Sequence, residues 1–348
     1  MPGIYLIIFY MMVRAKASLH LVAHRGASYF VPEESLAAYS LAAKHGVNFI
    51  ECDVVSTKDG VLILRHSPNL SESTNIDDLI EFSHLRRTEI LYDNNSNDAI
   101  TGIFSWDLTY EEIKRIKCTH EKKYNNRNPG LNGIYDILTL DEFLKFSVSG
   151  FDGNFPGLYI EIKYPTLHER KGIDNITDKL LDALDRFGIN KKTDAVYIQS
   201  FEPSNLEYIR AKSEVNLVQL LTRDSENNFV YAIEDVENGG EMKYVTCDIE
   251  YISKFANVVS PYKEDLIDLT NTSNNTLPSS SHFVSKAHEL GLIVVPYTFR
   301  PESILSYFKD IYEEYDYFIK TLKTDGLFTD DSQSIMQYVN NTGTQLYE

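Results

Sequence analysis

A repeated pattern of helix, glycine and strand constrains the fold of this chain most strongly. Three copies are clear: LAAYSLAAKHG before NFIECDV, LLDALDRFG before AVYIQSF, and VSKAHELG before LIVVPYTF. Glycine commonly ends a helix because it adopts the left-handed backbone conformation without strain. Apolar strands that alternate with amphipathic helices indicate parallel strands joined by crossover helices. The pattern therefore predicts an α/β fold.

Further apolar segments supply additional strands of the same sheet: LHLVAHR, LYIEIKY, VNLVQLL, NVVSPY and GLFTD. Composition does not change abruptly between them, and a share of 43% apolar residues is enough to fill a large core. We therefore predict a single domain over residues 18–340, folded as a (β/α)8 TIM-type barrel.

The segment VLILRH is a surplus strand candidate, because only STKDG separates it from the preceding strand. A parallel crossover usually requires a dozen or more residues, whereas Asp-Gly favours a two-residue hairpin turn. Such a turn at Asp59-Gly60 would place Asp53 opposite His66. In the alternative interpretation, VLILRH is an ordinary third barrel strand with an extended connector. Both interpretations bring His66 to the same end of the barrel.

Residues 67–157 lose this regularity. They include the Asn-rich segments YDNNSND and KKYNNRNPGLNG, together with WDLTYEEIKRIK and LTLDEFLKF, which look helical. Long connectors in barrels are usually functional or lid-like. We predict a subdomain inserted over the barrel mouth, the end formed by the carboxyl ends of the strands. The stretch from Asp224 to Glu241 also lacks a clear period and is predicted as a loop or a helix.

Three acidic residues on two predicted strands indicate a metal site. Glu51 and Asp53 are two residues apart in NFIECDV, so their carboxylates point to the same face of the strand. Glu161 and Lys163 share a face of LYIEIKY in the same way. Strand ends converge at a barrel mouth, and oxygen ligands favour Mg²⁺ or Ca²⁺ over zinc. We therefore predict one divalent cation held by Glu51, Asp53 and Glu161.

Two histidines and two basic residues complete the predicted chemistry. His24 and His66 stand at or just beyond strand ends, and Arg25 and Lys163 bring positive charge to the same place. A metal and basic groups offset the charge that builds on phosphorus oxygens, while two imidazoles move protons. This set suits phosphodiester cleavage. In the alternative interpretation, the acids form a structural salt-bridge cluster with the cations, and the histidines are ordinary surface or core residues.

The overall composition limits the range of partners. The formal net charge of −18 argues against nucleic acid, since contacts with a phosphate backbone rely on Lys and Arg. Three scattered cysteines, Cys52, Cys118 and Cys247, are too few for a disulfide framework and are predicted to be free thiols.

The N-terminal residues 1–17 resemble a signal peptide in part. The apolar run from Ile4 to Val13 has the length of a signal-peptide core and is too short to span a bilayer, so no firm membrane anchor is predicted. The basic residues follow the run instead of preceding it. We expect secretion or entry into the secretory pathway; the alternative is a cytoplasmic protein with a disordered or packed N-terminal segment.

Several short motifs resemble, in order, those of the glycerophosphodiester phosphodiesterase family: AHRGA, Pro32-Glu33, IECDVVSTKDG, the His after VLILR, YIEIK, IQSF, PYTFR and DGLFTD. The long segment after His66 is similar to that of the larger subgroup, known from bacterial periplasm and from plants. The resemblance spans roughly residues 20–335. It implies a barrel related to the phosphatidylinositol-specific phospholipase C type, a divalent metal, and hydrolysis of deacylated phospholipids to glycerol 3-phosphate and an alcohol.

The resemblance also implies roles for individual residues. His24 and His66 match the two catalytic histidines, and Arg25 and Lys163 match phosphate contacts. Glu51, Asp53 and Glu161 match the metal ligands. The substrate implied is a small glycerophosphodiester such as glycerophosphocholine, and no protein partner is implied.

This chain departs from the family pattern at two places. Ser67 follows His66 where the family usually has an acidic residue, and we expect reduced or shifted activity as a result. Glu34-Ser35 replaces a common Asn-Thr, from which we expect little effect. The alternative functions are a phospholipase D-like or cyclising lipid phosphodiesterase, and a binding module weakened in catalysis by Ser67. Tyr297 and Trp106 are aromatic candidates for contact with a choline head group, unless they serve ordinary packing.

Overall fold

The computed structural model describes residues 19–93, 96–149, 155–173, 175–224, 228–235, 241–267 and 282–344. The predicted signal peptide over residues 1–17 lies outside these ranges, as does part of the stretch from Asp224 to Glu241. Among the described residues, no helix combines the length and the apolar character needed to cross a bilayer. The three cysteines are free thiols, as predicted.

Eight parallel strands form a closed barrel, which confirms the predicted fold. In ring order they are β1 (His20–Ala23), β2 (Phe49–Ser56), β6 (Gly157–Ile162), β7 (Val196–Ser200), β8 (Asn216–Arg223), β11 (Val258–Pro261), β12 (Ile293–Val294) and β13 (Gly326–Thr329). The last strand pairs with the first, with His20 opposite Gly326. Closure between β12 and β13 is made by the amide of Asp325, which donates to the carbonyl of Val294 at 2.8 Å.

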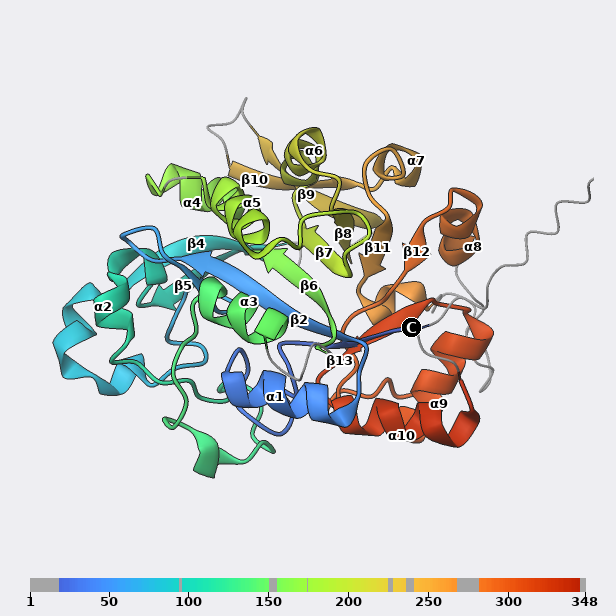
Figure 1. The fold of residues 1–348 in the computed structure, drawn as a ribbon, viewed down its shortest axis with the longest axis horizontal. Coiled ribbons are helices and arrows are strands. Elements are labelled where there is room, and N and C mark those ends of the chain that lie inside the picture. The colour runs from blue at the N-terminus through green and yellow to red at the C-terminus, as the bar shows by residue number, and fades with distance from the viewer. Residues whose placement is uncertain are drawn as a thin grey trace, which may run out of the picture.

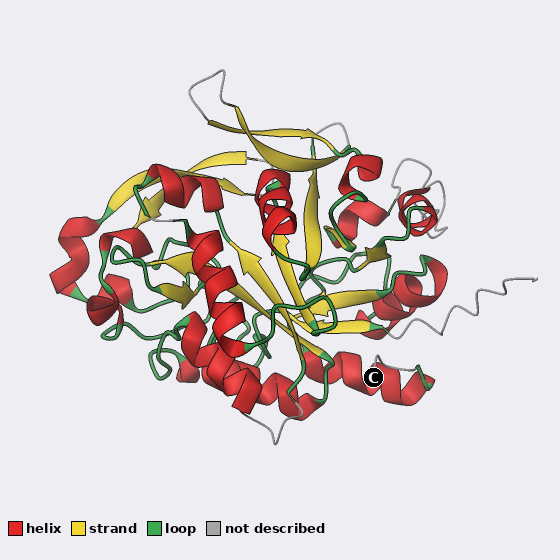
Figure 2. Cartoon of the chain, turned by 45° about the horizontal axis from the view of Figure 1, so that its top comes forward, coloured by secondary structure: helices red, strands yellow, loops and turns green. Residues whose placement is uncertain are grey.

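Helices surround the strands, as Figure 2 shows in red around yellow. They are α1 (Leu36–His45), α3 (Leu140–Ser149), α4 (Pro165–Arg170), α5 (Ile176–Phe187), α6 (Pro203–Lys212), α7 (Ile249–Ile252), α8 (His282–Glu289), α9 (Ile311–Asp316) and α10 (Ser332–Thr342). The glycine signals of the sequence act as expected. Gly46 and Gly188 end α1 and α5 with φ angles of 89° and 69°, in the left-handed region that favours glycine.

The surplus strand candidate is the second arm of a hairpin, β3 (Leu62–Leu64), which pairs antiparallel with β2. The predicted register is wrong by one residue, because Val54 pairs with Leu64 and Asp53 therefore lies opposite Arg65. The loop has three residues instead of two. The amide of Thr57 donates to the carbonyl of Val61 at 3.0 Å, and Gly60 takes a φ of 77° within the loop.

After β3 the chain builds a lobe beside the barrel, drawn in cyan and blue-green at the left of Figure 1. It contains a hairpin of β4 (Arg87–Asp93) and β5 (Ser96–Gly102), the short helix α2 (Tyr110–Ile113), and 3-10 turns at Ile76–Asp78, Ile80–Leu85, Ser105–Asp107 and Pro129–Leu131. A separate apolar cluster, which includes Ile76, Phe82 and Ile113, packs on Val55 and Ile63 of the β2–β3 hairpin. We call residues 67–139 the insertion lobe.

A second hairpin replaces the loop or helix predicted after Asp224. Strands β9 (Phe229–Asp235) and β10 (Glu241–Thr246) pair antiparallel, and β9 extends the end of β8. The aromatic and β-branched residues in FVYAIED favour a strand. The helical prediction for WDLTYEEIKRIK is also largely wrong, since only Tyr110–Ile113 is α-helical there.

Inside the barrel, strand alternation separates an aromatic layer from a polar one. At the amino ends of the strands, His20 stacks on Phe49 with ring centroids 4.6 Å apart, and Tyr159 stacks on Tyr197 at 4.7 Å. Two residues further along the same strands, on the same face, stand Glu51, Glu161 and Gln199. The aromatic layer therefore closes the bottom of the barrel, and the polar layer opens at the mouth.

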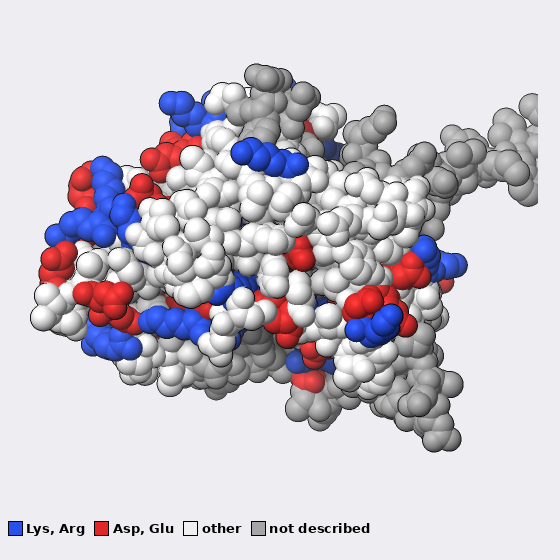
Figure 3. Space-filling view, turned by 90° about the horizontal axis from the view of Figure 1, so that it is seen from below, with Lys and Arg blue, Asp and Glu red and all other residues white. Residues whose placement is uncertain are grey.

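Acidic and basic side chains lie next to one another on the face drawn in Figure 3, around a broad uncharged area. The net charge of −18 therefore does not produce one continuous acidic surface on that face.

Candidate active site

Three buried carboxylates meet at the mouth of the barrel. Glu51, Asp53 and Glu161 each present an oxygen within 4.8 Å of the others, and β2 and β6 hold them side by side because Asp53 pairs with Glu161. All three are at least 93% buried. Neither oxygen of Asp53 accepts a hydrogen bond of suitable geometry from the described residues. Buried carboxylates at this spacing can hold a divalent cation.

Burial and the neighbouring charges shift the pKa values of these three carboxyl groups. Burial raises the pKa of Glu51, and the neighbouring charge of Asp53 raises it further. Burial and Asp53 likewise raise the pKa of Glu161 to about 8, against the opposing effect of Lys163. Burial alone would also raise the pKa of Asp53, but Arg25 and Lys163 hold it well below its usual range. Acids that resist ionisation together are ionised readily when a cation lies between them.

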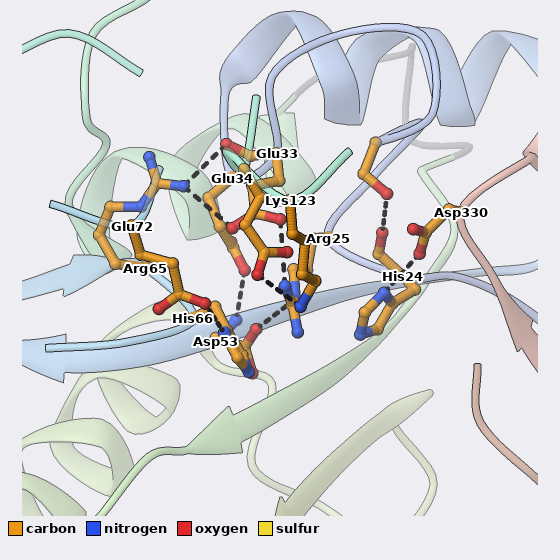
Figure 4. Close-up of polar contacts among 12 residues, drawn as sticks. His24, Arg25, Glu33, Glu34, Asp53, Arg65, His66, Glu72, Lys123 and Asp330 are labelled. Carbon is orange, nitrogen blue, oxygen red and sulfur yellow. Dashed lines mark hydrogen bonds and ion pairs between the residues drawn. The ribbon is translucent and has the colours of Figure 1, made fainter. Parts of the chain in front are cut away.

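The two predicted phosphate contacts are ion-paired with these acids. The Nε atom of Arg25 lies 2.9 Å from Oδ2 of Asp53, and the Nζ atom of Lys163 lies 2.9 Å from Oε1 of Glu161. Arg25 also bonds the carboxylate of Glu33 at 3.0 Å. Figure 4 shows Arg25 between Glu33 and Asp53. Both cations are almost wholly buried, and both line the cavity at the mouth.

His24 is held by an acid from the last strand. Its Nδ1 atom lies 2.7 Å from Oδ1 of Asp330, a contact visible in Figure 4. Burial lowers the pKa of His24 to about 4, and Arg25 lowers it too, although Asp330 opposes both. The imidazole is therefore neutral near pH 7. Its Nδ1 carries the proton that Asp330 accepts, which leaves the lone pair on Nε2.

His66 follows the end of β3 and faces the same cluster. Its Nδ1 atom lies 3.4 Å from Oε1 of Glu72, without a hydrogen bond of suitable geometry to any described residue. Burial lowers the pKa of His66 well below its usual value, and Arg25 and Lys163 add to the effect. His66 reaches the mouth even though the hairpin register is shifted, because it lies beyond the paired residues of β3.

A cavity of about 710 Å³ connects these groups, and six of the seven predicted site residues line it: His24, Arg25, Glu51, His66, Glu161 and Lys163. The seventh, Asp53, does not line the cavity. The volume suits a small organic ligand. The predicted residues, which span 140 positions of the chain, are thus gathered around one space.

The backbone after β1 is shaped to bring these groups together. Arg25 takes a φ of 56°, which is uncommon for a residue with a side chain, and its amide donates to Oε2 of Glu51 at 2.7 Å. The next residue, Gly26, has a φ of 80° and lies against α1, where a Cβ atom would come within 2.7 Å of the backbone of Ala38. Strained backbone of this kind is typical of functional sites.

Three residues of the site were missed by the sequence analysis: Asp330, Arg300 and Arg127. Asp330 follows β13 and ends the motif DGLFTD. Arg300 lies beyond β12 and ends the motif PYTFR, so both residues stand past the carboxyl ends of strands. Their position could have identified them. Arg127 lies in the Asn-rich part of the insertion lobe, where no pattern in the sequence marks it.

The remaining candidates have local roles. The Ser67 hydroxyl accepts a hydrogen bond from the amide of Asn69 at 3.1 Å and does not line the cavity. Trp106 is buried, stacked on Phe104 with centroids 5.3 Å apart, and does not line the cavity, so it serves the ordinary packing that was its alternative interpretation. Tyr297 does line the cavity.

The barrel fold and the residues at its mouth together define the class of protein, which is an α/β-barrel hydrolase that acts on phosphoric diesters. The chain belongs to the glycerophosphoryl diester phosphodiesterase family, whose model matches residues 24–334. It is 31% identical to glycerophosphodiester phosphodiesterase GDPD6 of Arabidopsis thaliana over 337 residues, which cover 91% of this chain and 85% of the plant protein. It is 26% identical to the glycerophosphodiester phosphodiesterase of Haemophilus influenzae over 343 residues, covering 90% and 88%. The chain is therefore a glycerophosphodiester phosphodiesterase.

Solved structures share the fold. A phosphodiesterase of Oleispira antarctica, in complex with the product sn-glycerol-3-phosphate, matches with a TM-score of 0.58 at 17% identity. That match covers 93% of this chain and 97% of the other. A glycerophosphodiester phosphodiesterase of Agrobacterium tumefaciens matches with a TM-score of 0.54 at 18% identity, covering 91% and 99%.

Proposed function

We propose that this protein hydrolyses glycerophosphodiesters to glycerol 3-phosphate and an alcohol by metal-dependent, two-histidine catalysis. The observation that carries the proposal is a cluster of three buried carboxylates beside one cavity, which two of them line together with both imidazoles. The product bound in the Oleispira antarctica phosphodiesterase supports glycerol 3-phosphate as the product here. Glycerophosphocholine and glycerophosphoethanolamine are the substrates to test first.

The three carboxylates fit a divalent cation. Glu51, Asp53 and Glu161 offer only oxygen donors, which suits Mg²⁺ or Ca²⁺, and the oxygens of Asp53 have no hydrogen bond of suitable geometry within the described residues. When bound, such a cation neutralises charge on the phosphoryl oxygens and orients the reacting groups. Arg25 and Lys163 add donors for the same oxygens, and the guanidinium fork matches the geometry of a phosphate.

His24 serves as the general base in this proposal. Asp330 fixes its Nδ1 proton at 2.7 Å, so Nε2 is free to take a proton from the attacking water. The depressed pKa of His24 keeps the imidazole unprotonated near pH 7, as a base must be.

His66 serves as the general acid that protonates the departing alkoxide. Burial opposes its protonation, and so do the cations Arg25 and Lys163. A bound phosphodiester brings negative charge that offsets these cations and favours the imidazolium form. Glu72, at 3.4 Å from Nδ1, acts in the same direction.

The proposal is tested by replacing His24 and following product release. We expect His24→Ala to lower kcat for glycerophosphocholine at least about 10²-fold, the usual scale for loss of acid–base catalysis. His84→Ala is the matched control, because His84 is exposed and does not line the cavity. Release of glycerol 3-phosphate is measured enzymatically and by ³¹P NMR.

Unchanged turnover in His24→Ala would refute the assignment of the base. The same ³¹P spectra discriminate the alternative functions. A cyclic phosphate product would indicate a cyclising enzyme, and cleavage restricted to intact lipid would indicate a phospholipase D-like activity. Wild-type protein that binds metal but cleaves no diester would indicate a binding module.

A further inference from the structure

Arg127 connects the insertion lobe to the seam between the first and the last barrel strands. Its guanidinium donates to the Ser28 carbonyl at 3.0 Å, in the loop that follows β1, and to the carboxylate of Asp330, which follows β13. A third contact joins its Nε to Oε1 of Glu302 at 2.8 Å. The side chain is 1% exposed and lies over the ring of Tyr124, 3.8 Å from the centroid. Four contacts on a buried side chain fix its position closely.

The acid that Arg127 contacts is the one that orients His24. Asp330 uses its two oxygens differently: Oδ1 accepts from His24, whereas Oδ2 is held by Arg127 and, at 2.8 Å, by Arg300. Two guanidinium groups on Oδ2 fix the plane of the carboxylate and keep Oδ1 directed at the imidazole. Burial would raise the pKa of Asp330, but Arg300, Arg127 and His24 hold it well below its usual range.

The loop that carries His24 is tied to the same point. The amide of Tyr29 donates to the Asp330 carbonyl at 3.1 Å, and the Ser28 hydroxyl donates to the His24 carbonyl at 2.8 Å. Arg127 therefore contacts both partners of the His24–Asp330 pair: the acid directly, and the histidine loop through the carbonyl of Ser28. Arg300 makes only the first of these two contacts among the hydrogen bonds described here.

We propose that Arg127 is a positioning residue. By holding Asp330 and the loop after β1, it links the placement of the insertion lobe to the orientation of His24 for catalysis. The proposal rests on the role of His24 proposed above. It predicts that an insertion lobe without this arginine still packs on the β2–β3 hairpin. Oδ2 of Asp330 is then held by Arg300 alone, so the acceptor of the His24 Nδ1 proton is fixed less closely.

The test is a double-mutant cycle on kcat for glycerophosphocholine. We expect Arg127→Gln to lower kcat by about tenfold to a hundredfold, the usual effect of removing a group that orients a working side chain, and to change KM less than about threefold. Asp330→Asn should lower kcat further. The double variant should match Asp330→Asn within about threefold, because residues that act through one another are not additive.

Two further variants separate positioning from folding. Arg115→Gln is the matched control, since Arg115 is also in the insertion lobe, pairs with Glu81 at 3.1 Å and lies over the ring of Phe82 at 4.8 Å. It should leave kcat unchanged. Arg127→Lys keeps the charge but lacks the fork that reaches both Ser28 and Asp330, so it should rescue kcat only in part. Thermal unfolding of every variant shows whether the fold is retained.

Nitrogen-15 NMR of the His24 imidazole gives a readout that a purely structural role would not move. The wild type should show the Nδ1-protonated tautomer, and Arg127→Gln should show a mixture. The inference is overturned if Arg127→Gln lowers kcat equally in the Asp330→Asn background, or if it raises KM alone. His24→Ala decides the proposed function separately: if that variant is fully active, the role of His24 fails whatever Arg127 does.

Discussion

Glu33 and Glu34 are adjacent in sequence and both fully buried, yet their environments are opposite. Glu33 lies between the guanidinium groups of Arg25 and Arg65, at 3.0 and 3.5 Å, and these hold its pKa well below the usual range although burial opposes them. Burial and the charge of Asp53 raise the pKa of Glu34 well above its usual value. Glu34 accepts a hydrogen bond from the Tyr39 hydroxyl and, at 3.0 Å, from the amide of Asp53.

Glu34 therefore supports a predicted metal ligand directly. It takes a φ of 60°, a conformation that Asn tolerates better than Glu, and the family commonly has Asn here. The sequence predicts little effect from this departure. The structure places Glu34 in the buried cluster, in contact with the backbone of Asp53.

Ser67 is the other departure, and it allows a direct test. An acid at this position could still accept the amide of Asn69 and would add a charge beside His66. We expect Ser67→Asp to raise kcat/KM for glycerophosphocholine by about tenfold, the lower end of the range for groups that orient a site. Ser67→Asn is the matched control, because it has the same shape without the charge. An equal response of the two variants would show that the charge at this position is irrelevant.

The sequence predicts which residues share a face and which stand at strand ends, and this is why residues that lie together at the barrel mouth could be named as candidates from the sequence. Two-residue spacing on a strand is a local property, and strand ends of a barrel converge by necessity. Asp330 is bonded to His24 across 306 positions, and Arg127 contacts Asp330 across 203. Such contacts depend on the closing of the barrel and on how the insertion lobe packs. No local sequence pattern encodes either of these.

At the level of elements, the turn after β1 should be sensitive to substitution. Arg25 and Gly26 are both in the left-handed region, and α1 packs against the second of them. This turn places the amide of Arg25 on Glu51, so its geometry is linked to the proposed metal site. A side chain at Gly26 would meet strain in the backbone and collision with Ala38 together.

We expect Gly26→Ala to lower the free energy of unfolding by about 3 kcal/mol, from the left-handed backbone and from overpacking. Gly133→Ala is the matched control. Gly133 has a φ of 75°, but no described atom lies within 4 Å of the Cβ it would gain, so the loss there should be only about 1 kcal/mol. Urea denaturation measures both losses. Equal losses would show that the contact with α1 is not tight.

The predicted helices and strands are correct where one period of apolar residues dominates the sequence, and wrong where no period does. The barrel strands and the helices that end at Gly46 and Gly188 follow clear patterns. The predicted β2–β3 register is wrong because Asp-Gly fits both two- and three-residue loops, and only the hydrogen bonds between Thr57 and Val61 decide between them. The strand β9 was missed because its apolar residues form one run and do not alternate with polar residues.

On the scale of the whole molecule, the barrel supplies the acids and His24, and the added β2–β3 hairpin supplies His66. The insertion lobe then reaches across the mouth to the seam between β1 and β13, where Arg127 ends. The proposed catalytic groups thus come from parts of the chain that only the complete fold brings together. Loss of any one part should impair turnover more than binding.

The central claim is that Glu51, Asp53 and Glu161 hold a cation on which turnover depends. The most direct measurement is glycerol 3-phosphate release by chelator-treated protein as Mg²⁺ or Ca²⁺ is added back, for the wild type and for Asp53→Asn. Wild-type turnover should vanish on chelation and return in a saturable way. Asp53→Asn should need at least about tenfold more metal, the usual cost of disturbing a metal site. Full turnover of protein shown by elemental analysis to be free of metal would contradict the claim.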